Sequence, residues 1–71
     1  MSITVESLQD DEVVDIMNGL NQAMGPSPEM NLIAVLAMKK GGVFFESGAR
    51  LSKFLSDLRE RHRKITAAGQ P

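Results

Sequence analysis

The sequence predicts a small all-α protein in which three helices form a bundle, the third being the longest and amphipathic. Apolar residues recur at the i, i+3, i+4 spacing of a helix in two segments and run almost without a polar break in a third segment between them. Serine, proline and glycine stand at the ends of these segments, where helices begin and end. The expected helices cover residues of about 7–24, 28–40 and 47–67.

The first expected helix, 7–24, begins with Ser7 as its N-cap. Acidic residues at 10–12 follow in the first turns, where they favour the positive end of the helix dipole. Gly19 either weakens this helix or lets another helix approach closely, and Gly25 with Pro26 ends it. One face is expected to be buried, and it carries Val13, Ile16, Met17, Leu20 and Met24.

The second expected helix, 28–40, opens with Ser27 at the N-cap and Pro28 at the first helical position. Residues 30–38 then run almost without a polar break, which predicts an element buried on most sides. A buried strand is the competing interpretation. The cap and the ending at 39–42, two lysines and two glycines, favour a helix.

The third expected helix, 47–67, is capped by Ser47 and is the longest of the three. Its distal part, residues 59–64, is expected to project beyond the core, because the other two helices are shorter. At 100° per residue one apolar stripe runs along it, made of Leu51, Phe54, Leu55, Leu58, His62 and Ile65.

The loop before this helix contains Val43, Phe44 and Phe45 and is too apolar for an idle connection. One interpretation is that one or both rings plug the open end of the bundle. The other is that they form an exposed anchor for a partner, since aromatic anchors dominate many interfaces.

Charge is distributed unevenly along the chain. All six charged residues up to Glu29 are acidic, whereas eight basic residues stand against three acidic ones from Lys39 onward. Three interpretations stay open: pairing within the molecule, pairing between protomers, or a basic end that meets an anion. Against nucleic acid, the isoelectric point near 5.7 is far from that of a basic domain.

Size bears on function as well. We treat residues 1–71 as one domain, with 1–6 and 68–71 expected to be flexible. Below roughly 70–80 residues one core rarely supplies more than about 3–5 kcal/mol, and natural solutions are disulfides, metals or association. Because the chain has no cysteine, neither a disulfide nor a thiolate zinc site is possible. Self-association or docking on a partner remains.

No pattern in the chain indicates catalysis. His62 is the single histidine and is interpreted as a core or interface residue, because a nucleophile needs a partner base and an orienting group. We expect no enzyme, cofactor or metal. Residues 1–6 lack a basic region and a long apolar run, so no secretory signal is expected. No membrane partner is expected either, and the cytoplasm is the expected compartment.

The leading hypothesis is a small non-enzymatic interaction or regulatory module, such as an inhibitor, that acts as a homo-oligomer or docks on a protein partner. Its candidate interaction residues are Phe44, Phe45, Arg59, Arg61, His62, Arg63 and Ile65. The alternative is an anion-binding protein, with nucleic acid or a nucleotide as ligand. Its candidate residues are Lys39, Lys40, Arg59, Arg61, Arg63 and Lys64.

Overall fold

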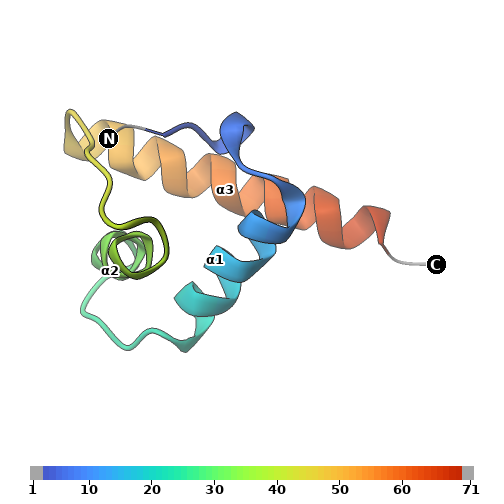
Figure 1. Ribbon diagram of the computed structural model, residues 1–71, viewed down its shortest axis with the longest axis horizontal. Helices are drawn as coiled ribbons and strands as arrows, with labels where there is room; N and C mark the ends of the chain where they lie inside the picture. Colours follow the sequence, from blue (N-terminus) through green and yellow to red (C-terminus); the bar gives the residue numbers. More distant parts are fainter. Residues whose placement is uncertain (1–2, 70–71) are drawn as a thin grey trace.

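The structure, a computed structural model, describes residues 3–69 and confirms the predicted all-α, three-helix fold. A short 3₁₀ helix precedes the three α-helices. In Figure 1, α3 runs the length of the molecule and α1 and α2 pack on the same side of it. The elements in order are η1 (Val5–Ser7), α1 (Asp10–Gln22), α2 (Pro28–Lys40) and α3 (Gly48–Ala68).

The bounds of α2 and α3 follow the predicted caps. The Ser27 hydroxyl accepts a hydrogen bond from the Met30 N–H at 3.2 Å, and Gly41 closes α2 in the left-handed region at φ 76°. The Ser47 hydroxyl accepts from the Arg50 N–H at 3.2 Å and starts α3. Local sequence therefore sets these ends.

The start of α1 differs from the prediction, because Ser7 is not its N-cap. Ser7 ends η1 instead, donating its hydroxyl to the Thr4 carbonyl at 2.7 Å. Leu8 and Gln9 are extended, and α1 begins at Asp10. Glu12 then accepts a hydrogen bond from the Gln9 N–H at 2.9 Å, the reciprocal half of a capping box.

The end of α1 also differs. The helix stops at Gln22, with Ala23 extended, so Met24 lies beyond the helix. Its side chain is 97% exposed and does not join the buried face predicted for it. The helix is shorter than expected at both ends, 13 residues in place of about 18.

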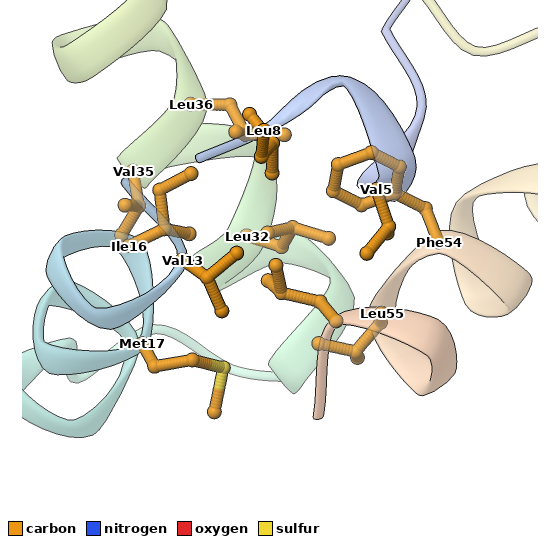
Figure 2. Close-up of a cluster of buried hydrophobic side chains, with 11 residues drawn as sticks. Val5, Leu8, Val13, Ile16, Met17, Leu32, Val35, Leu36, Phe54 and Leu55 are labelled. Atoms are coloured by element: carbon orange, nitrogen blue, oxygen red, sulfur yellow. The ribbon is translucent and has the colours of Figure 1, made fainter. Parts of the chain in front are cut away.

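The core gathers apolar side chains from η1 and all three α-helices, as Figure 2 shows. Val5 and Leu8 are buried in it, whereas the sequence predicts a flexible lead over residues 1–6 and no buried face that includes Leu8. At the other end, Ala68 is the last residue of α3, and residues 70–71 lie outside the described part. The buried residues are Val5, Leu8, Val13, Ile16, Met17, Leu32, Val35, Leu36, Phe54, Leu55 and Leu58.

Gly19 lies where α1 packs against α2. A Cβ built on Gly19 would stand 3.1 Å from a Val35 methyl carbon and 3.4 Å from Cε of Lys39. Of the two roles considered for this glycine, close approach of another helix is therefore the one it fulfils. Over residues 3–69, no helix has both the length and the apolar composition that a membrane span requires.

Candidate functional site

The most distinctive surface of the molecule is an exposed apolar face along α2. Only Leu32, Val35 and Leu36 of this helix are buried, so the prediction that α2 is buried on most sides is wrong. The opposite side is exposed and follows i, i+3, i+4, i+7, i+8 spacing. We call it the α2 outer face, and it consists of Met30, Ile33, Ala34, Ala37 and Met38.

The reason for this exposure is the number of helices. Both α1 and α3 contact α2, and the residues it buries occupy one side of its helix. The part of the chain that the structure describes has no fourth α-helix to cover the other side. As a result Met38 is 83% exposed, and the apolar run at 30–38 serves both the core and the surface.

Beside the outer face lies an open apolar hollow of about 330 Å³. Ile33 lines it from α2, Leu51 lines it from α3, and Val43, Phe44 and Phe45 line it from the loop between the helices. The hollow thus connects the outer face with the aromatic loop, and together they form one apolar surface.

The two phenylalanines of the loop have separate roles. The Phe45 ring packs edge-on against Phe54, with centroids 5.3 Å apart and planes at 71°, and contributes to the core. Phe44 is 63% exposed. Of the two interpretations of this loop, the plug therefore describes Phe45 and the exposed ring describes Phe44.

A second hollow, of about 340 Å³, lies on the other side of these rings, against η1 and α3. Apolar side chains such as Phe45 and Phe54 line it, and so do five charged residues: Glu6, Glu46, Arg50, Lys53 and Asp57. Lys53 pairs with Asp57 at 2.8 Å, and this carboxylate raises the pKa of Lys53. The mixed charges on the walls favour no one class of ligand.

The arginines of α3 differ in what they contact. Arg61 is half-buried and donates to the Val5 carbonyl at 2.6 Å and to the Asp10 carboxylate at 2.8 Å. Ile65 packs against the core. The expected projection of the distal part of α3 beyond the core is therefore wrong at these two positions, because Arg61 bonds to η1 and to the first residue of α1, and Ile65 packs on the core.

The remaining candidates on this helix are more open. Arg63 is exposed and pairs with Glu60 at 2.5 Å. Arg59 and Lys64 are exposed as well, and His62 is half-buried. The last turns of α3 do extend past α1, as the red end of the ribbon in Figure 1 shows.

The two lysines at the end of α2 face acidic residues of α1. Lys39 pairs with Asp15 at 3.1 Å, and Lys40 pairs with Glu12. The Lys40 ammonium group, aided by the Gln9 N–H, holds the pKa of Glu12 below its usual range. With the Arg61–Asp10 pair, these contacts place pairing between the acidic and basic halves within the molecule.

No protein family model, curated protein or solved structure matches this chain. Within residues 3–69, the structure brings together no group of three or more histidine or acidic side chains suited to a metal ion. Sequence reasoning missed the α2 outer face as a candidate site. The available signal was the run at 30–38 itself, which has more apolar faces than two neighbouring helices can cover.

Proposed function

We propose that this chain is a small non-enzymatic interaction module that binds a protein through the α2 outer face and Phe44. The observation that carries the proposal is the continuous apolar surface that α2, the 330 Å³ hollow and the exposed Phe44 ring form. Exposed apolar patches of this kind mark protein-binding surfaces more often than idle ones. The module works by occupying a surface, and we expect it to do so in the cytoplasm.

The anion-binding alternative has less support from the structure. Of its six candidate residues, Lys39, Lys40, Arg61 and Arg63 already pair with carboxylates of the same chain. A phosphate would have to displace these carboxylates before it could bind. Of the six candidates, Arg59 and Lys64 are the two for which no such displacement is needed. The acidic first half of the chain would also repel the phosphate backbone of a nucleic acid.

Photo-crosslinking in cells tests the interaction module. A photoreactive residue replaces Met38 on the outer face, and a matched control carries it in place of Ser52, which is exposed on α3. We expect a protein adduct from position 38, none from position 52, and loss of the adduct when Ala34→Glu is added. Equal labelling from both positions, or no adduct from position 38, would contradict the proposal.

A further inference from the structure

We propose that the α2 outer face binds the same face of a second copy of this chain, with the two α2 helices antiparallel about a two-fold axis. The inference rests on the proposed function and names its partner. It is carried by the composition of the face, by the placement of its small residues and by two charges at its edge.

The composition of the face suits contact with itself. A two-fold interface brings one surface against its own copy, so charges near the centre would meet like charges. The α2 outer face consists of five apolar residues and carries no ionisable group. Two copies can therefore meet without burying an unpaired charge.

The small residues stand between larger ones along the face. Ala34 and Ala37 lie between Met30 and Ile33 on one side and Met38 on the other. Small side chains at a crossing allow the two helix axes to come close. In an antiparallel pair Ala34 would face Ala37 of the second copy at the centre of the contact. Toward the two edges, Ile33 would lie beside Ala37 of the second copy and Met38 beside Ala34 of the second copy.

The edge charges select the antiparallel orientation. Glu29 and Lys40 are separated by about three helical turns, so they lie on the same edge of the outer face at opposite ends of α2. An antiparallel two-fold pair joins like edges and opposite ends, and so brings Glu29 of each copy toward Lys40 of the other. The Lys40 ammonium group, which already pairs with Glu12, would then bridge two carboxylates without losing its own pair. A parallel pair would set this edge against the Asn31 edge, with no charge pair. Within residues 3–69, Glu29 has no ion-pair partner.

The size of the face sets the strength of association. A helix of 13 residues is about 20 Å long, whereas a standard interface buries about 800 Å² on each partner. That area is about a sixth of the 4787 Å² surface of this chain. A single helix pair with Phe44 beside it belongs to the small class of interfaces, and we expect a dimer that dissociates on dilution.

Sedimentation equilibrium from about 10 μM to 1 mM tests association in this affinity range. The mass should rise from 7.7 kDa toward twice that value. Ala34→Glu should weaken the dimer at least tenfold with an unchanged helical circular dichroism spectrum, and Ser52→Glu should behave as wild type. Should Ala34→Glu lose helix content, Met38→Gln serves in its place. A monomer at every concentration, or a dimer indifferent to these changes, overturns the proposal.

Cysteine pairing tests the orientation, since the natural chain has no cysteine. Ala34→Cys and Ala37→Cys chains are mixed and oxidised, and mass spectrometry identifies the disulfides formed. An antiparallel pair sets position 34 of one copy opposite position 37 of the other, in disulfide range, so the mixed product should dominate. Dominant disulfides between two Ala34→Cys chains or two Ala37→Cys chains would indicate a parallel pair and overturn the proposal.

The two proposals fail differently. A chain that stays monomeric but yields an adduct with another protein from position 38, lost with Ala34→Glu, retains the proposed function and loses the self-pairing. A chain without any adduct from that position and without a dimer loses both.

Discussion

Leu58 is the fully buried centre of the α3 stripe and belongs to the core cluster that η1 and the three α-helices form. Shortening it to alanine leaves a cavity in that core. We expect Leu58→Ala to lower the free energy of unfolding by about 2–5 kcal/mol, the range for a fully buried leucine. Urea denaturation followed by circular dichroism measures the change, and a loss under about 1 kcal/mol would be too small for a site this well buried.

Arg61 and Arg63 stand two positions apart on α3, yet only Arg61 reaches another element. Arg61→Glu would set a carboxylate against the Val5 carbonyl and the Asp10 carboxylate, so we expect a loss of about 1–3 kcal/mol in unfolding free energy. Arg63→Glu breaks only the local pair with Glu60 and should change the free energy of unfolding by less than about 0.5 kcal/mol. Parallel thermal melts compare the two variants, and equal losses would contradict the role given to Arg61.

At the scale of elements, the packing of α1 on α2 depends on the absence of a side chain at Gly19. Gly19→Leu would push Val35 and Lys39 away and should cost about 1–3 kcal/mol, despite the better helix propensity of leucine. Gly48→Leu is the matched control, because an added Cβ there meets nothing within 4 Å. Chemical denaturation of both variants checks this, and a Gly19→Leu protein as stable as the control would mean that the helices separate freely.

At the scale of the whole molecule, the acidic first half is tied to the basic second half, and this link depends on pH. Because Lys40 lowers the pKa of folded Glu12, this carboxylate stabilises the fold above its unfolded pKa. The contribution disappears as pH falls through the folded value. We expect the melting temperature of Glu12→Gln to fall less steeply than that of wild type on acidification below about pH 5.

Lys40→Met should give the same shallower profile, since it removes the other member of the pair. At neutral pH the double variant should lose no more melting temperature than the less stable of the two single variants. If the two decreases in melting temperature add up in the double variant, Glu12 and Lys40 act independently.

Much of this architecture could be predicted from local chemistry, because the caps at Ser27 and Ser47 and the glycine at 41 act within a few residues. The start of α1 could not, since Ser7 suits either the last residue of η1 or the N-cap of α1, and burial of Val5 and Leu8 favours the first. The α2 outer face was missed for a similar reason. A run of apolar residues indicates burial, but the number of neighbouring elements determines how many of its faces are covered.

The contact between Val5 and Arg61 joins residues 56 positions apart, and it has a consequence for synthesis of the chain. At about 5–20 residues per second, roughly 3–11 s pass between translation of the two residues. Until Phe54, Leu55 and Leu58 have left the ribosome, η1 has no α3 to pack on, and α2 lacks one of its two neighbouring α-helices. The nascent chain is then more apolar at its surface than the finished one, so chaperones that bind exposed apolar segments should engage it before α3 emerges and release it afterwards.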